Sequence, residues 1–426
     1  MGVQNPFRPS FGTTPLILAG RADMIAAFGE AIDDGPGAPG RATLYTGARG
    51  TGKTVMLNEV GTEAAQRGWI VIHETATEGF VTRLVGQHLP HLLAAHDPKA
   101  KRTKLKGGNL VGVGGLNWDT VDKHVISVRL RNQLEQLCTL LRGNGTGLLI
   151  TLDEIHHRQV DELRDFFTTL QHLIREDHEI AFAAAGLPSE VSDLLNDSVL
   201  TFLRRAERQV LGAVGYGEVE RTMRETVESS GRTIDPHALT LAAKATGGYP
   251  FLIQLVGYQI WRRSPQVTEI GATDVEQGVT DALRRMGSQV HEPALAELSV
   301  IDRTYLIAMA QDEGPSSTGH IADRLGVTAS YAGVYRRRLL DAQMIESHGY
   351  GRVTFALPYM REFIREHVVT EAPLRPAQPP DPRSSEPYQS RPIQHADPPK
   401  PEYQGADDTQ GGQTPLRRVS PEIVEI

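Results

Sequence analysis

Residues 47–54 read Gly-Ala-Arg-Gly-Thr-Gly-Lys-Thr, and this stretch decides the fold class of the chain. It follows a short β-type run, Ala42–Thr46, and opens a helical pattern, Lys53–Arg67. A glycine-rich turn between a strand and a helix points several backbone N–H groups at one anion, next to the positive end of the helix. The pattern Gly-x-x-x-x-Gly-Lys-Ser/Thr is matched without an exception, so we expect a phosphate-binding loop. Its expected ligand contacts are Gly47, Ala48, Arg49, Gly50, Thr51, Gly52, Lys53, Thr54 and Val55.

Four side chains carry the chemistry expected of this loop. Lys53 supplies a positive charge for the β- and γ-phosphates of a nucleotide, and Thr54 supplies a hydroxyl for Mg²⁺. About 100 residues later an apolar run, Leu148–Leu152, ends in Asp153 and Glu154. We expect Asp153 beside the metal and Glu154 as the group that polarises an attacking water. Together the two motifs predict hydrolysis of ATP with Mg²⁺ as cofactor.

The rest of the first 214 residues alternates β-type runs with helical patterns, which favours an α/β fold with a parallel sheet and crossover helices. The predicted strands are 42–46, 69–73, 148–152, 180–185 and 209–211. From 215 to 291 the pattern is purely helical, with segments at 217–229, 236–246, 250–263 and 273–286. We call this second region the helical lid.

Composition and charge limit the class of protein to which this chain can belong. Hydrophobic residues make up 39% and charged residues 23%, which suits a globular protein. No apolar run approaches the ~20 residues of a membrane span, and the N-terminus lacks a secretory pattern, so we expect a cytoplasmic protein without membrane contact. The single cysteine, Cys138, excludes a disulfide framework. The net charge of −8 limits any nucleic-acid contact to a local patch.

Two segments read as irregular. Residues 98–118 form a basic, glycine-rich insertion, either a hairpin or a mobile loop, and periodicity does not decide between the two. Residues 371–426 hold 12 of the 26 prolines and few apolar side chains, so we expect a disordered tail.

Residues 294–370 predict a winged helix: helices at 299–310, 320–325 and 329–343, then a two-stranded wing at 344–357. The third helix and wing, 329–352, are a candidate contact for duplex DNA. Its expected exposed face consists of Ser330, Tyr331, Tyr335, Arg336, Arg337 and Arg352. We expect Arg338 to stack on the wing and Val334 to be buried with Leu339 or Leu340. The unit has 8 Lys and Arg against 9 Asp and Glu, which argues against DNA. The sequence leaves open whether this unit contacts DNA or is an internal regulatory element.

Three further candidates lie outside the two motifs. Gly20 and Arg21 begin the first helix and are placed to lie under a nucleotide base, and Pro250 opens an apolar lid helix where it can line the base pocket. Arg205, in an arginine-bearing segment before the fifth strand, is a candidate to reach the γ-phosphate in its own or a neighbouring subunit. The alternative for Arg205 is a solvated helix end.

In this order the motifs resemble the P-loop ATPases of the AAA+ and STAND groups, especially the origin-recognition-like ATPase domain, over roughly residues 9–370. The resemblance implies that Lys53 and Thr54 hold phosphate and Mg²⁺, that Asp153 holds the metal, and that Glu154 is the catalytic base. Two features depart from AAA+ members: the fourth strand, up to Gly186, lacks a polar sensor, and the lid helix has no arginine before Arg262. Both departures favour slow hydrolysis.

The favoured interpretation is an ATP- and ADP-binding switch whose nucleotide state controls the winged helix. The first alternative is a DNA-binding initiator or regulator. The second is a signalling scaffold in which the nucleotide controls homo-oligomers or a protein partner, without DNA.

Overall fold

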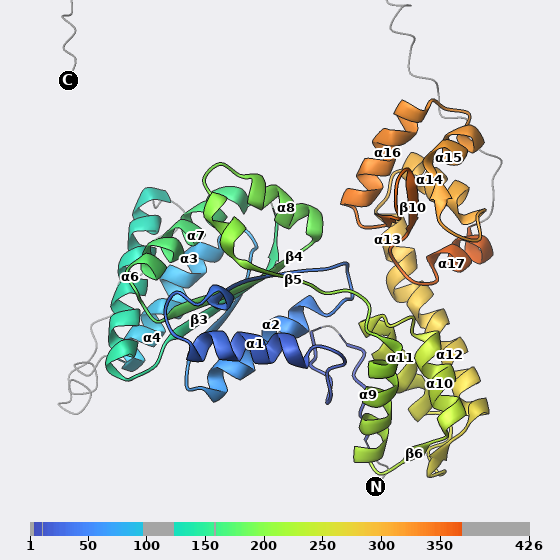
Figure 1. Ribbon diagram of the computed structural model, residues 1–426, viewed down its shortest axis with the longest axis horizontal. Helices are drawn as coiled ribbons and strands as arrows, with labels where there is room; N and C mark the ends of the chain where they lie inside the picture. The colour runs from blue at the N-terminus through green and yellow to red at the C-terminus, as the bar shows by residue number, and fades with distance from the viewer. Residues whose placement is uncertain (1–3, 11, 97–122, 157–158, 369–426) are drawn as a thin grey trace, which may run out of the picture. The chain divides into compact units, whose positions relative to one another are not determined.

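The computed structural model describes residues 4–10, 12–96, 123–156 and 159–368, and Figure 1 shows its ribbon. These residues belong to one compact unit, Met1–Pro376. The insertion 98–118 and the expected tail 371–426 lie outside the described residues. What the sequence predicts for these two segments therefore stays a prediction.

Five parallel strands form the central sheet in the order β2-β3-β4-β1-β5. The strands are β1 (Ala42–Thr46), β2 (Ile70–Thr75), β3 (Leu148–Ile155), β4 (Ile180–Gly186) and β5 (Glu207–Val210). Each coincides with a predicted run to within a few residues, so the α/β prediction is confirmed.

Both faces of this sheet are buried, as an apolar parallel sheet requires. Along β4, alternate residues Ala181, Ala183 and Ala185 pack toward α1 (Ala22–Asp33) and α2 (Lys53–Gln66). The other set, with Phe182 at its centre, packs toward the opposite helices. Those helices are α3 (Phe80–Arg83), α4 (Leu89–His96), α6 (Lys123–Gly143), α7 (Val160–Arg175) and α8 (Pro188–Asn196). Figure 1 shows α1 and α2 on one side of the sheet and α6 and α7 on the other.

The helical lid follows β5. Its helices are α9 (Tyr216–Ser229), α10 (Pro236–Ala245), α11 (Pro250–Trp261) and α12 (Ala272–Met286). A short parallel pair, β6 (Thr233–Ile234) and β7 (Glu269–Ile270), ties two of its loops together. All four helices agree with the predicted segments to within two residues.

A π-helical turn, Gly287–His291, leads from α12 into the C-terminal elements. These are α13 (Glu292–Ala296), α14 (Val300–Ala310), β8 (Ser316–Ser317), α15 (Thr318–Leu325), α16 (Ala329–Asp341), β9 (Ile345–Ser347), β10 (Arg352–Phe355) and α17 (Met360–His367). The three strands form an antiparallel sheet in the order β8-β10-β9. Helices α14, α15 and α16 and the β9–β10 hairpin occur where the sequence predicts them, whereas α13, α17 and the two-residue strand β8 were not predicted.

Helix α16 is rotated relative to our expectation. Its fully buried residues are Ala332 and Leu339, a spacing that places Val334 on the outer face, where 57% of it is exposed. The prediction that Val334 is buried was therefore wrong. Arg336 was also misplaced: it is half-buried and donates to the Ser347 hydroxyl of β9 at 3.2 Å.

Arg338 was expected on the wing, but its guanidinium pairs instead with the Asp302 carboxylate of α14 at 2.7 Å. The exposed arginines of α16 are thus Arg337 and Arg338. In the part of the chain that the structure describes, no helix has the length and apolar character needed to cross a membrane.

Candidate nucleotide site

The loop at residues 47–54 connects the carboxyl end of β1 to the first turn of α2. Gly50 and Gly52 have φ values of 75° and 90°, a left-handed conformation that glycine adopts without steric cost. The Thr51 hydroxyl donates back to the Ala48 carbonyl at 2.8 Å and closes the turn. The loop therefore has the tight wrap that a phosphate-binding turn needs.

Lys53 lies across this turn. Its ammonium donates to the carbonyls of Gly47 and Ala48 at 2.8 and 3.0 Å. Burial lowers the pKa of Lys53, and the carboxylate of Asp153 opposes that shift. The charge is thus concentrated at the mouth of the loop and faces the acidic end of β3.

Thr54 and Asp153 meet as the sequence predicts, although 99 positions separate them. The Thr54 hydroxyl donates to the Asp153 Oδ2 at 2.5 Å. Hydroxyl and carboxylate oxygens are ligands that suit Mg²⁺, which usually takes one or two protein oxygens together with substrate phosphates. Within the described ranges no group of three or more His, Cys, Asp or Glu side chains is placed to hold a metal ion. The residues present therefore fit a Mg²⁺ ion shared with a nucleotide better than an all-protein metal cage.

Glu154 lies one residue beyond and is exposed at the edge of the sheet. Its φ is 55°, an uncommon left-handed value for a residue with a side chain. The pairing of β3 with β4 shifts register between Leu152 and Ile155, so Glu154 occupies a β-bulge. A bulge redirects a side chain at the end of a strand. No sequence pattern signals this conformation.

The lid reaches the loop through the start of α11. The Tyr249 hydroxyl donates to the Arg49 carbonyl at 2.6 Å, and the Phe251 N–H donates to the Gly50 carbonyl at 3.3 Å. A Cβ atom on Gly50 would lie 1.9 Å from the Tyr249 Oη, so only glycine fits there. Burial raises the pKa of Tyr249, which keeps its hydroxyl protonated as a donor. Pro250 lies between these two contacts, and its expected place in a base pocket stays a prediction. The role of Tyr249 was missed.

Gly20 and Arg21 lie near the connection from β5 to the lid. The Arg21 guanidinium donates to the Gly212 carbonyl at 2.5 Å, and burial lowers its pKa. Gly20, with φ 60°, lies against Val214, where a Cβ atom would approach to 3.0 Å. Both residues therefore pack against the connection between the sheet and the lid.

The N-terminal segment also approaches α2, which sequence reasoning missed. The Asn58 amide donates to the Gly12 carbonyl at 3.1 Å, one turn after Thr54. Earlier in the segment, Phe7 is buried on α11 against Gly257. The segment thus joins the lid to the helix that carries the loop.

Arg205 is not brought to the site of its own chain. It ends a 3₁₀ turn, Thr201–Arg205, just before β5 begins. Because β5 runs parallel to β1 with Glu207 opposite Thr43, Arg205 lies at the amino edge of the sheet. The loop lies at the carboxyl edge, several residues away along a strand, beyond the reach of one side chain. The expectation that Arg205 reaches the γ-phosphate in its own subunit was wrong, and its trans alternative stays a prediction.

Two family models match parts of this chain. Residues 17–182 match the family described as AAA ATPase domain, and residues 288–364 match a domain of unknown function (DUF8462). No curated protein matches the chain.

Three solved structures are similar to the described fold. The Walker-type ATPase of Pyrococcus abyssi has a TM-score of 0.56 at 15% identity, covering 82% of this chain and 96% of that chain. The ORC2 protein of Aeropyrum pernix in its ADP form has a TM-score of 0.49 at 14% identity, covering 85% and 98%. The RuvB Holliday junction branch migration motor of Thermotoga maritima has a TM-score of 0.41 at 16% identity, covering 83% and 96%. Residues 17–182 thus match an AAA ATPase domain, and the similarity to the Pyrococcus structure shows a shared P-loop ATPase fold.

Proposed function

We propose that this ATPase is a molecular switch that binds ATP·Mg²⁺ at the 47–54 loop, hydrolyses it slowly, and passes its nucleotide state through the lid to the C-terminal elements. The observation that carries the proposal is the contact of the lid with the loop itself. Tyr249 and Phe251 bond to the carbonyls of Arg49 and Gly50, at the apex of the turn that surrounds the phosphates. If the conformation of that turn changes when nucleotide binds or phosphate leaves, these hydrogen bonds transmit the change directly to α11.

The chemistry follows from the placed side chains. The loop N–H groups and Lys53 hold the phosphates, while Thr54 and Asp153 would hold Mg²⁺, which when bound neutralises charge on the phosphate oxygens. Glu154 accepts a proton from the attacking water as the water oxygen bonds to the γ-phosphorus. The bond from that phosphorus to the bridging oxygen breaks, and ADP leaves with that electron pair.

Slow turnover is supported by what surrounds the site. Strand β4 ends in buried apolar residues up to Gly186, and Arg205 of the same chain is at the other edge of the sheet. P-loop enzymes without an arginine at the γ-phosphate hydrolyse slowly, and an added arginine raises kcat by about 10³–10⁵.

The test is ATP turnover in single- and multiple-turnover conditions, together with size-exclusion chromatography in ADP and in ATP. We expect slow hydrolysis and a nucleotide-dependent change in elution volume. Turnover without any difference between the ADP and ATP states in size or protease sensitivity would contradict the switch. An ATP-dependent oligomer that ignores DNA would favour the scaffold interpretation.

A second candidate function is duplex DNA binding by a winged helix formed by α14–α16 and the β9–β10 hairpin. The observation in its favour is the hairpin tip, where Tyr350 is 107% exposed between Gly349 and Gly351. Arg352 follows on β10, and Arg337 is exposed on α16. If this surface binds phosphates, replacing Arg337 and Arg352 by Ala weakens binding and flattens its salt dependence by about one unit per lost contact.

Fluorescence anisotropy with labelled duplex at low salt, in ADP and in ATP, measures this binding. Lys244→Ala, on exposed α10 surface of the lid, is the matched control. Wild-type protein that ignores duplex in both nucleotide states rules the DNA function out and leaves the switch.

A further inference from the structure

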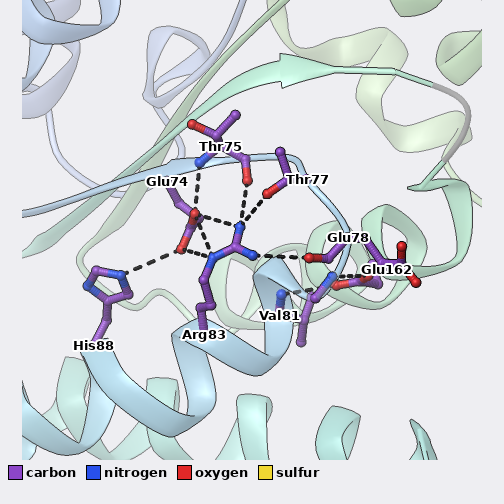
Figure 2. A network of polar contacts seen from close by, with 9 residues as sticks. Glu74, Thr75, Thr77, Glu78, Val81, Arg83, His88 and Glu162 are labelled. Atoms are coloured by element: carbon purple, nitrogen blue, oxygen red, sulfur yellow. Dashed lines mark hydrogen bonds and ion pairs between the residues drawn. The ribbon is translucent and has the colours of Figure 1, made fainter.

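Three side chains form a network at the end of β2, beside the acidic end of β3. We call Glu74, Arg83 and Glu162 the corner clamp, because they surround the turn at residues 75–79. Figure 2 shows them with the turn between them. Glu74 is the last residue but one of β2, Arg83 ends α3, and Glu162 lies in the first turn of α7.

Arg83 makes an unusually complete set of contacts for one side chain. Its guanidinium pairs with the Glu74 carboxylate at 2.9 Å. It also donates to the Thr75 carbonyl, the Thr77 hydroxyl and the Glu78 carbonyl at 3.0, 2.8 and 3.0 Å. The Glu74 side chain is only 8% exposed, so its charge needs this partner. A planar fork of five donors can make such a set, whereas an ammonium cannot.

Glu162 holds the same turn from the other side. Its two carboxylate oxygens accept the N–H groups of Gly79 and Val81 at 2.8 and 3.1 Å. Gly79 has φ 77°, a left-handed conformation, and is the residue just before α3. Because α7 follows β3 in the chain, the clamp connects the turn after β2 to the helix that comes after Glu154.

The turn contacts the acidic end of β3 through the backbone. Thr75 is the register partner of Asp153, and the Ala76 N–H donates to the Asp153 carbonyl at 2.9 Å. The next residue is Glu154, with its strained φ of 55°. A conformation of this kind persists only where its surroundings determine it fully. The clamp is the part of those surroundings that lies away from the phosphate loop.

We propose that Arg83 is a positioning residue for hydrolysis: by fixing the turn at 75–79 it holds Asp153, and so keeps Glu154 in the bulged conformation that aims its carboxylate. The proposal rests on the proposed function, in which Glu154 acts on the attacking water. It predicts that a weakened clamp slows hydrolysis without weakening nucleotide binding, because the turn contacts the backbone carbonyl of Asp153 and not the carboxylate that bonds to Thr54. Strands β3 and β4 also lie between β2 and β1, the strand that leads into the 47–54 loop.

The test uses Arg83→Lys in the full chain, which keeps a positive charge beside Glu74 but loses the simultaneous contacts to the turn. We expect single-turnover hydrolysis to fall tenfold or more, with the ATP dissociation constant within twofold of wild type and a nearly unchanged melting temperature. Arg131→Lys is the matched control, because Arg131 also pairs with a glutamate, Glu176, at 2.7 Å in the same domain. We expect it to leave hydrolysis unchanged.

A double-mutant cycle with Glu154→Gln separates positioning from general support. If Arg83 acts through Glu154, adding Arg83→Lys to Glu154→Gln causes no further loss in hydrolysis followed over hours. A further tenfold loss in that background, or a parallel loss of ATP binding, overturns the inference. Wild-type hydrolysis by Arg83→Lys overturns it too, while Glu154→Gln with wild-type hydrolysis instead overturns the catalytic role assigned under the proposed function.

Should Arg83→Lys not fold, Glu162→Gln tests the same turn, because a glutamine offers one oxygen where two N–H groups need acceptors. The expected pattern is again slower hydrolysis with intact ATP binding. Hydrolysis at the wild-type rate in that variant contradicts the proposal.

Discussion

Glu154 combines a reactive position with a strained backbone. Its place after Asp153 was predictable, since a carboxylate at the end of an apolar strand is a sequence pattern. Its φ of 55° and the bulge around it were not, because they arise from pairing with β4 and from contacts with the turn after β2. A left-handed conformation costs a residue with a side chain roughly 1–2 kcal/mol relative to glycine.

Glu154→Gly and Glu154→Gln therefore differ in stability but agree in activity. We expect both to bind ATP and lose turnover. Glycine removes the strain, so the free energy of unfolding should rise by about 1 kcal/mol in Glu154→Gly and stay at the wild-type level in Glu154→Gln. Thermal unfolding and single-turnover hydrolysis measure the two effects. Equal stabilities for the two variants would show that the bulge carries no strain.

Lys53 provides the second prediction at this scale. Its ammonium faces the loop carbonyls and Asp153, so Lys53→Ala removes the charge nearest the expected β- and γ-phosphates. We expect ATP·Mg²⁺ affinity to fall at least tenfold, about 1.4 kcal/mol, in calorimetry. Lys244→Ala is the control. A folded Lys53→Ala protein that binds ATP like wild type contradicts the site.

At the scale of elements, helices and strands were largely predictable because apolar spacing repeats with the period of each. The elements that were missed are short or depend on distant partners. Strand β8 has two residues, and Tyr249 meets the loop only because the fold brings α11 to residue 49, 200 positions away. Arg205 was misplaced although a parallel sheet puts a residue that precedes a strand at the amino edge, opposite the loop that follows β1. Glu74, Arg83 and Glu162 form their network from three separate segments.

Tyr249→Phe tests the contact between lid and loop. It removes one hydrogen bond, worth about 1 kcal/mol, from the Arg49 carbonyl. We expect release of a fluorescent ADP analogue to become roughly fivefold faster in stopped flow. Tyr258→Phe, on the same helix, is the control, because its hydroxyl has no hydrogen bond among the described residues. Identical release rates in Tyr249→Phe and wild type would argue that the lid does not retain nucleotide.

At the scale of the whole chain, His291 lies where the lid passes into the C-terminal elements. It is 1% exposed, and its Nε2 donates to the Pro358 carbonyl at 2.8 Å. Burial lowers the pKa of His291 to about 4, although the Pro358 carbonyl and the Glu362 carboxylate oppose the shift. The unfolded chain, with a histidine pKa near 6.5, therefore binds a proton that the folded chain does not.

The stability contributed by neutral His291 is complete above pH 6.5 and is lost as the pH falls toward 4. At pH 5 we expect a loss of at most about 2 kcal/mol relative to pH 7.5. Replacing His291 with Gln removes the titrating group, so the difference between the melting temperatures at pH 5 and pH 7.5 should shrink. An unchanged difference in that variant would assign the acid sensitivity to other groups.

Arg49 offers its carbonyl to Tyr249 of the lid, and its guanidinium lies 3.3 Å from the Glu297 carboxylate between α13 and α14. One residue of the phosphate loop thus contacts both the lid and the C-terminal elements. Thermodynamic linkage makes such sharing reciprocal: if nucleotide strengthens the hold of the loop on the lid by some factor, then whatever steadies the lid tightens nucleotide binding by the same factor. A ligand of the C-terminal elements can accordingly be detected without knowing its identity, as a change in the affinity for ADP.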